Sequence, residues 1–488
     1  MSANRPLVSL KEAGVSLIDC DHKTPKAQDQ GLPYIGIPQL KDGRIILEGA
    51  RLISEEDFKH WRRKAKPTAN DVLLSRRCNP GESAFVPDGL EIALGQNLVL
   101  LRSDGTKVHP AFLRWLTQGP QWWSQVNQYL NVGAVFDSLK CADIPKFEVY
   151  LPPIDEQKSI AKVLGDLDHK ILLNHQINQT LEQMAQAIFK SWFVDFEPVK
   201  AKIAAREAGG SEDDALLTAM RAISGTSLFD ADASAAGAEA ELARLQAEQP
   251  EQYAELRATA KLFPSAMQES ELGEIPEGWG VSQIGDEVTV VGGGTPSTKN
   301  PIFWEGGRIS WTSPKDLSNL ADKVLVETER KITEAGLAKI SSGLLPINTV
   351  LMSSRAPVGY LAMAKIPVAV NQGYIAMKCE KVLSPEFVIQ WCEAHMDEIK
   401  SRASGTTFAE ISKKNFKIIP VVVPPESLMS AYTRQVLPLY EAIEINVRES
   451  DNLAQLRDTL LPKLLSGELS LTTTVFEPDS RNVADATA

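Results

Sequence analysis

Clustered lysines and arginines are the side chains with the clearest chemical capacity in this sequence. Such groups bind phosphate through their charge, and arginine also matches the acceptor edge of guanine. The candidates for DNA contact are Lys59, Arg62, Arg63, Lys64, Lys66, Arg76, Arg77, Arg355, Arg402, Lys413, Lys414 and Lys417. A single basic cluster is more often a solvated surface, so these residues leave DNA binding and an ordinary charged face both open.

The motifs of familiar enzyme sites are missing from the sequence. No phosphate-binding loop with the required lysine and hydroxyl occurs, and the glycines at 292–296 are typical of a turn. Asp143 with Glu156-Gln157-Lys158 fits a metal nuclease only loosely, because Glu156 and Lys158 fall at a predicted helix start. Pro152-Pro153-Ile154 lacks the flanking polar and aromatic residues of an amino-methyltransferase loop. We therefore expect no catalytic residue, no metal and no cofactor in this chain.

Composition narrows the class of protein further. The five cysteines are scattered without a C-x-x-C pair, which argues against a disulfide scaffold and a zinc finger. No apolar run approaches the ~20 residues of a membrane helix, and the first ten residues lack an export signal, so a cytoplasmic protein is expected. The 488 residues carry a net charge of −12, but residues 201–275 alone hold 14 acidic and 6 basic side chains. The rest of the chain is near neutral.

The chain contains two copies of one unit. Residues 70–77 resemble residues 348–355, and further along the copies match at a constant offset of 272. The matched pairs are Gly133 and Gly405, Phe136 and Phe408, Leu139 and Ile411, Pro152 and Pro424, Ile171 and Ile443, Asn174 and Asn446, and Leu181 and Leu453. Because Arg76, Arg77 and Arg355 follow matched strands, we predict that they lie nearer the bases than the other cations do.

Each copy is predicted to be a mixed domain followed by a long helix, in an α+β fold. Helices are expected at 110–117 and 385–394, between strands at 33–37, 98–101, 147–151, 307–311, 349–352 and 418–423. Prolines and acids at 152–156 are typical of a helix start, and apolar periodicity continues to Trp192. A helix of about 38 residues spans about 57 Å, which is longer than a small domain is wide.

The two long helices show the heptad spacing of a helix pair. We expect an antiparallel pair centred near Gln176, in which Asn174 faces Ser450 and Asn178 faces Asn446. The predicted seam comprises Leu167, Ile171, Asn174, Asn178, Leu181, Ile188, Leu439, Ile443, Asn446, Ser450, Leu453 and Leu460. Buried polar pairs fix register at a cost in stability, so changing all four to leucine is expected to preserve or raise the melting temperature.

Several motifs together give the chain a family resemblance. They are LPPIDEQ at 151–157, AIFKSWFVDF at 187–196, GEIPEGW at 273–279, GGTP at 293–296 and LPKLLSGEL at 461–469. With these motifs the chain resembles the specificity (S) subunit of type I restriction–modification systems over nearly its whole length. The second copy departs from the family pattern, because Pro424-Pro425 is followed by Glu426-Ser427-Leu428-Met429 where the first copy has Glu156-Gln157.

The resemblance implies a chain that recognises DNA without catalysis of its own. Two mixed α/β target recognition domains would each read one half of an asymmetric split target. Two long antiparallel helices would form a coiled-coil spacer that separates the domains, sets the spacing and docks the partners. The expected organisation is domain 1 at 1–150, the first helix at 151–196, an acidic helical connector at 197–275, domain 2 at 276–423, the second helix at 424–470 and a disordered tail at 471–488.

The same resemblance implies partners and their chemistry. Two modification (methyltransferase) subunits would methylate adenine with S-adenosylmethionine, and restriction (endonuclease) subunits would use ATP and Mg. The residues themselves leave two other functions open, a coiled-coil adaptor that binds no nucleic acid and an enzyme without a recognisable motif. Salt-dependent DNA binding would separate the adaptor from a DNA-recognition subunit, and activity of the purified chain alone would reveal the enzyme.

Overall fold

The structure is a computed structural model that describes residues 5–21, 23–133, 136–227, 235–405 and 409–471. All but the first residue of the predicted tail, and Phe408 of the repeat, lie outside the described residues. The chain divides into two compact units: unit 1 is Met1–Ile171 with Asn452–Ala488, and unit 2 is Leu172–Asp451. This division cuts through both long helices, whereas the sequence predicted helices separate from the two domains. No helix in the described part of the chain could cross a membrane.

Unit 1 is built on short strands, and its main sheet is antiparallel with the order β2–β10–β7–β8. These strands are Val15–Asp19 (β2), Leu98–Ser103 (β10), Val72–Ser75 (β7) and Ser83–Phe85 (β8). The other strands are Arg51–Ile53 (β6), Leu32–Ile35 (β3) and Ala93–Leu94 (β9) in one sheet, Leu40–Lys41 (β4) with Arg44–Ile45 (β5), and Leu7–Ser9 (β1) with Glu148–Tyr150 (β11). The central β7 is buried throughout, which explains its uninterrupted apolar run.

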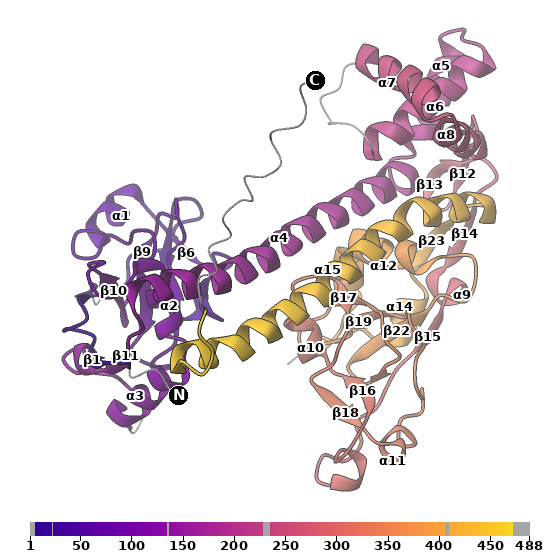
Figure 1. The fold of residues 1–488 in the computed structure, drawn as a ribbon. Helices are drawn as coiled ribbons and strands as arrows, with labels where there is room; N and C mark the ends of the chain where they lie inside the picture. Colours follow the sequence, from indigo (N-terminus) through magenta and orange to yellow (C-terminus); the bar gives the residue numbers. More distant parts are fainter. Residues whose placement is uncertain (1–4, 22, 134–135, 228–234, 406–408, 472–488) are drawn as a thin grey trace, which may run out of the picture. The chain divides into compact units, whose positions relative to one another are not determined.

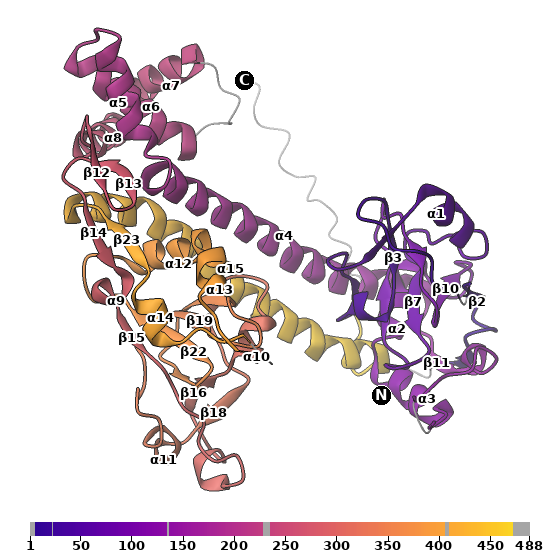
Figure 2. The ribbon, with the colours of Figure 1, turned by 180° about the vertical axis from the view of Figure 1, so that it is seen from behind.

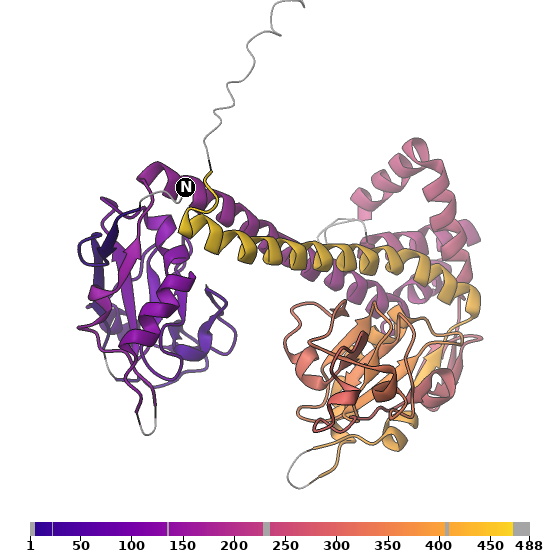
Figure 3. The same cartoon turned by 60° about the horizontal axis from the view of Figure 1, so that its bottom comes forward.

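The helices of unit 1 connect its sheet to both long helices. They are Glu55–Trp61 (α1), Pro110–Leu116 (α2), Pro120–Tyr129 (α3), the start of Ile154–Phe193 (α4) and the end of Glu426–Ser466 (α15). The first turns of α4 and the last turns of α15 lie side by side (Figure 3). Ile160 and Leu164 of α4 share a buried core with Trp115 of α2 and Leu464 of α15. The core of unit 1 therefore includes both helices.

A buried carboxylate on α4 strengthens this connection. Arg457 of α15 lies 2.7 Å from Asp168 Oδ1, and Arg44 of β5 lies 3.3 Å from the same oxygen. Arg114 of α2 pairs with the other oxygen, and burial lowers the pKa of Arg114 to about 9. A buried charge that loses its partners is strongly destabilising. Asp168 therefore holds three other elements of unit 1 against α4.

Unit 2 repeats the strand plan of unit 1. Its main sheet has the order β15–β22–β19–β20–β17, formed by Thr289–Val291 (β15), Tyr374–Lys378 (β22), Val350–Ser353 (β19), Leu361–Ala364 (β20) and Val324–Leu325 (β17). The other strands are Arg330–Ile332 (β18), Ile309–Thr312 (β16), Ala369–Val370 (β21), Gly280–Gln283 (β14) and Pro420–Val423 (β23). Strand β16 pairs antiparallel with β18 and parallel with β21, as β3 does with β6 and β9. The predicted strands are all present, so the α+β prediction is confirmed.

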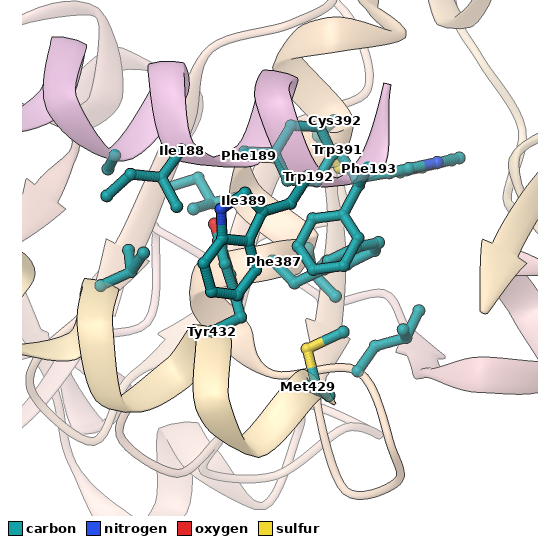
Figure 4. Close-up of a cluster of buried hydrophobic side chains, with 14 of the residues drawn as sticks. Ile188, Phe189, Trp192, Phe193, Phe387, Ile389, Trp391, Cys392, Met429 and Tyr432 are labelled. Atoms are coloured by element: carbon teal, nitrogen blue, oxygen red, sulfur yellow. The ribbon is translucent and has the colours of Figure 1, made fainter. Parts of the chain in front are cut away.

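Helix α12 (Pro385–Ala394) buries an aromatic cluster together with α4 and α15. The other short helices around the sheets of unit 2 are Ile284–Glu287 (α9), Pro314–Ser318 (α10), Glu334–Leu337 (α11), Met396–Ser401 (α13) and Lys413–Lys417 (α14). Helix α12 lies between α15 and the main sheet (Figures 1 and 2). Phe387 of α12 meets Phe193 of α4 with ring centroids 5.0 Å apart, and Tyr432 of α15 with centroids 6.3 Å apart (Figure 4). Met429, at the position of Gln157 in the first copy, is buried in this cluster.

The described residues of the predicted acidic connector form four helices and, at its end, a hairpin. Its helices are Glu197–Glu207 (α5), Glu212–Ser227 (α6), Ala235–Glu248 (α7) and Pro250–Leu262 (α8). The prediction is wrong for the last residues, where Met267–Ser270 (β12) pairs with Gly273–Pro276 (β13) in a hairpin. Gly273 adopts φ 92° in this hairpin, a conformation that glycine takes readily.

The seam places the predicted polar residues opposite one another within unit 2. Asn174 Nδ2 donates to Ser450 Oγ at 3.2 Å, and Asn446 Nδ2 donates to Asn178 Oδ1 at 2.9 Å. The antiparallel register that the sequence predicts is therefore present there. Most apolar seam residues lie in or against the core of their own unit: Leu167 and Leu460 in unit 1, and Leu181, Ile188, Leu439 and Ile443 in unit 2. Of the other two seam residues, Ile171 is buried and Leu453 is half-buried.

The polar seam belongs to a larger network than the sequence indicated. Asn178 Nδ2 also donates to Asp322 Oδ2 at 3.1 Å, and His175 Nδ1 lies 2.9 Å from the same oxygen. Next to it, Lys323 Nζ lies 2.7 Å from Glu182 of α4 and pairs with Glu393 of α12. The loop before β17 thus connects the sheet of unit 2 to α4 through buried charges.

Candidate nucleic-acid interface

One end of the main sheet, here called the loop edge, is built in the same way in both units. In unit 1 it is the end at which Ser75 pairs with Leu98, and in unit 2 it is the end at which Ser353 pairs with Tyr374. Three segments meet at this end in each unit: the turn after β7 or β19, the turn before β10 or β22, and part of a longer loop. They are 76–82, 95–97 and 136–139 in unit 1, and 354–360, 371–373 and 409–411 in unit 2.

Matching backbone hydrogen bonds hold the loops together. In unit 1 the backbone N–H of Arg76 donates to Asn97 and that of Leu139 donates to Arg76. In unit 2 Ser354 donates to Gly373 and Ile411 donates to Ser354 in the same way, and all four bonds measure 2.8–3.0 Å. The turns also share their backbone conformation, because Cys78 (φ 65°) matches Ala356 (φ 58°) and Gly81 (φ 96°) matches Gly359 (φ 109°). The two loop edges are therefore one structure that occurs twice.

Each loop edge carries an arginine at the same position. Arg77 is exposed, and its backbone forms a bridge with Ser138 in the longer loop. Arg355 forms the equivalent bridge with Glu410, whose carboxylate lies 3.5 Å from its guanidinium, and 39% of the Arg355 side chain is exposed. Both side chains are accessible to a ligand at the loop edge.

Arg76 differs from this shared arginine. Its position is taken in unit 2 by Ser354, and only 13% of its side chain is exposed. Its guanidinium lies 4.0 Å from Asp19 at the end of β2. Arg76 is thus a partly buried group specific to unit 1.

The fold divides the first basic cluster, the candidate lysines and arginines at 59–66. Lys64 Nζ lies 2.7 Å from Asp21 and Arg63 Nη2 lies 3.7 Å from it, just beyond the end of β2 at the loop edge. The hydrogen bond from Lys64 holds the pKa of the Asp21 carboxyl below its ordinary value and raises the pKa of Lys64. More than half of each cationic side chain is exposed. Arg63 and Lys64 therefore lie on the same side of the sheet end as Arg76, which pairs with Asp19 two residues before Asp21.

The other members of this cluster have different surroundings. Arg62 is largely buried, where it pairs with Glu91 at 3.0 Å and its guanidinium lies over Phe58. Lys59 forms only an exposed pair with Glu55 on α1. Lys66 is exposed, and its carbonyl accepts a hydrogen bond from Arg102, which lies toward the opposite end of β10. The structure does not bring Lys66 to the loop edge.

The candidate cations of the second copy, Arg402 and the lysines at 413–417, are divided in the same way. Lys413 lies at the loop edge, because a side chain at Gly292, just after β15, would lie 2.8 Å from Lys413 Nζ. Lys417 instead packs on Gly285 of α9, at the other end of β15. Arg402, just after the end of α13, pairs with Glu398 of that helix at 2.6 Å, and Lys414 is exposed on α14.

A pocket of about 460 Å³ with mixed polar and apolar walls opens at the loop edge of unit 2. The side chains that line it include Ser313, Lys315, Arg355, Tyr360 and Asn371. Sequence reasoning missed Lys315 and Asn371, because neither lies in a basic cluster. Their only signal was position, since Asn371 directly follows β21 and Lys315 lies three residues after β16, in the first turn of α10.

The structure at the loop edge of unit 2 explains why the segment after β15 is rich in glycine. A Cβ atom on Gly293 would lie 1.8 Å from the carbonyl oxygen of Val370, so the close backbone approach excludes any side chain. Gly294 donates to that carbonyl at 2.9 Å, and Thr295 Oγ1 donates to Gln372 at 2.6 Å. The segment is irregular, and the turn lies at residues 298–299 rather than at the predicted 292–296; the glycines support the loop before β22.

The residues at 156–158, which loosely match a metal-nuclease motif, make contacts that hold the start of α4 in place. Glu156 pairs with Arg5 at 2.7 Å, and Lys158 pairs with Asp155 at 2.9 Å on the surface of α4. Gln157 is buried, and it accepts from the His109 backbone and donates to the Lys107 carbonyl, both at 2.8 Å. The segment after Pro152 therefore connects the start of α4 to the loop before α2 through Gln157.

Cysteines and metal ligands do not form a site in the described residues. Burial raises the pKa of the Cys20 thiol to about 11 and also raises the pKa of Cys141, Cys379 and Cys392, which disfavours a thiolate nucleophile. Within the described ranges, no group of three or more His, Cys, Asp or Glu side chains could hold a metal ion.

Comparison with known proteins gives consistent matches. The family model described as "Type I restriction modification DNA specificity domain" matches residues 18–183 and again residues 276–428. The HindI type I restriction enzyme specificity subunit of Haemophilus influenzae is 31% identical over 414 residues, which cover 82% of this chain and 86% of that protein. The MjaIX specificity subunit of Methanocaldococcus jannaschii is 34% identical over 196 residues, covering 40% and 45%. A solved type I restriction–modification S subunit from M. genitalium aligns over 95% of this chain and 97% of its own, with 14% identity and a TM-score of 0.47.

Proposed function

Because this chain belongs to the type I restriction–modification DNA specificity family, we propose that each unit reads one half of an asymmetric split DNA target through its loop edge. The observation that carries this proposal is the repeated loop edge, which occurs once in each segment matched by the family model. Two copies of one structure suit two half-sites, and different side chains around a common frame suit half-sites of different sequence. The named relatives are specificity subunits, not methyltransferases or nucleases.

We also propose that the long helices set the distance between the half-sites and dock two modification subunits. Exposed apolar side chains support docking, because Leu172, Leu173 and Ile177 on α4 and Ile445 on α15 are each 39–66% exposed. Leu173 and Ile445 match at the offset of 272, so the helices present related patches. Two related apolar patches fit two copies of one partner. S-adenosylmethionine, ATP and Mg would belong to the modification and restriction subunits.

Mapping of methylated adenines in host DNA tests the proposed function. We expect a split motif whose methylation disappears when the gene for this chain is deleted and returns when the gene is restored. Replacing Leu173 and Ile445 with glutamate should reduce assembly with the modification subunits, while the same change at the exposed Leu272, on the β12–β13 hairpin, should not. A motif that survives deletion of this chain would refute the assignment.

A further inference from the structure

The loop edges of the two units differ in a restricted set of side chains. The matched positions are Arg77 and Arg355, Gln96 and Gln372, Arg76 and Ser354, Glu82 and Tyr360, Pro38 and Lys315, and Gly95 and Asn371. The first two pairs are identical, and the rest differ in charge or hydrogen-bonding capacity. If the units read different half-sites, the identical residues cannot encode the difference.

The identical arginines fit a feature that every half-site possesses. Phosphate groups are such a feature, because their spacing and charge are the same in any sequence. Arg77 and Arg355 are accessible on matched turns, and Arg355 borders the pocket of unit 2, where its guanidinium is already paired with Glu410 at 3.5 Å. The shared position therefore suits positioning on the DNA backbone.

The residues specific to unit 2 converge on its pocket and present donors. Asn371 Oδ1 already accepts the backbone N–H of Gly373 at 2.6 Å, which leaves its amide group to donate. Lys315 Nζ adds a second donor group, and its exposed pair with Glu329 is of the weak kind that a ligand displaces readily. In the major groove guanine presents two adjacent acceptors, N7 and O6, whereas cytosine presents a donor. A pocket wall of donors thus favours guanine.

We propose that Lys315 and Asn371 are specificity-determining residues that read a guanine in the half-site of unit 2, while Arg355 makes the same phosphate contact as Arg77 in unit 1, in place of the position nearer the bases that the sequence suggested for both arginines. This inference rests on the proposed function, because it presupposes that the loop edges face DNA. Unit 1 has Pro38 and Gly95 at the two positions, so it lacks both donors. The guanine contact is therefore specific to unit 2.

The test measures DNA affinity of the full chain assembled with its partners, on duplexes that carry the mapped target or single base-pair changes. Asn371→Asp keeps the acceptor that closes the turn and removes the donor, so the loop conformation is preserved. Lys315→Met removes the other donor, and Lys331→Met, which disrupts another exposed ion pair in unit 2, is the matched control. Salt dependence is measured for Arg77→Ala and Arg355→Ala.

We expect Asn371→Asp and Lys315→Met to reduce discrimination at one G·C pair of one half-site by about tenfold to a hundredfold, with the other half-site read as before. Arg77→Ala and Arg355→Ala should weaken all duplexes alike and lower the salt slope by about one each. Uniform weakening by the pocket variants, or a changed base preference in the arginine variants, would overturn the inference alone. Absence of sequence-dependent binding by the unaltered assembly would overturn the proposed function as well.

Discussion

Asn178→Leu tests whether the polar seam residues act as isolated register pairs or as parts of a network. The Asn178 side chain is 1% exposed and bonds in two directions, to Asn446 at 2.9 Å and to Asp322 at 3.1 Å. Leucine would leave the Asp322 carboxylate, whose side chain is 7% exposed, with His175 as its remaining described partner in this network. We therefore expect loss of stability, contrary to the expectation from the heptad pattern alone.

The magnitude follows from the lost contacts. A hydrogen bond to a charged acceptor contributes about 1.5–3 kcal/mol, and the burial of leucine offsets about 1 kcal/mol of its loss. The free energy of unfolding should thus fall by about 0.5–2 kcal/mol. At about 2–4 °C per kcal/mol for a unit of this size, the melting temperature of unit 2 should fall by about 1–8 °C.

Thermal and urea unfolding of the full chain would measure this change. Asn174→Leu, one turn away, is the comparison variant: it removes hydrogen bonds to Glu449 Oε2 at 2.8 Å and to Ser450 Oγ at 3.2 Å. Because Glu449 is only half-buried, its carboxylate can be hydrated and we expect a smaller loss of stability than for Asn178→Leu. In the Asn178→Leu and Asp322→Leu double variant, the second change should cost less than it does alone, because the stranded carboxylate is gone. If Asn178→Leu is as stable as the unaltered protein, the network contributes nothing and the simple register explanation stands.

The other predictions concern DNA binding and spacing. The double variant Arg63→Ala and Lys64→Ala should weaken binding to all DNA sequences alike and lower the salt dependence of the affinity by up to about two. Arg62→Ala should reduce stability and leave that salt dependence unchanged. Equal salt dependence for both variants in filter binding would contradict this division. Seven residues inserted after Ile171 and after Asn452 lie opposite each other in the antiparallel register and lengthen each helix by about 10.5 Å. The mapped spacer should then grow by at most about three base pairs at about 3.4 Å each, with unchanged half-sites, or activity should be lost because each base pair adds roughly 35° of rotation. An active variant that keeps the original spacer would refute the spacing role.

Local pattern was enough to predict several features of this protein. The strands around residues 349–352 and 418–423 and the long helices follow from apolar periodicity and from prolines at helix starts, which act over a few residues. The register that joins Asn174 to Ser450 also followed, because an antiparallel pair of matched helices allows little choice once the polar positions are aligned.

Only the tertiary structure decided which side chains share a site. Sequence proximity grouped Arg62 with Arg63, but the fold buries the first against Glu91 and places the second at the loop edge. Asp322 and Asn371 lie in loops with no motif, and they gain a role only because strand pairing brings those loops to α4 and to the pocket. Strand order and loop convergence depend on contacts between residues far apart in the chain, which a local pattern does not encode. The physical reason is that charge and hydrogen bonding act through space, whereas periodicity acts along the backbone.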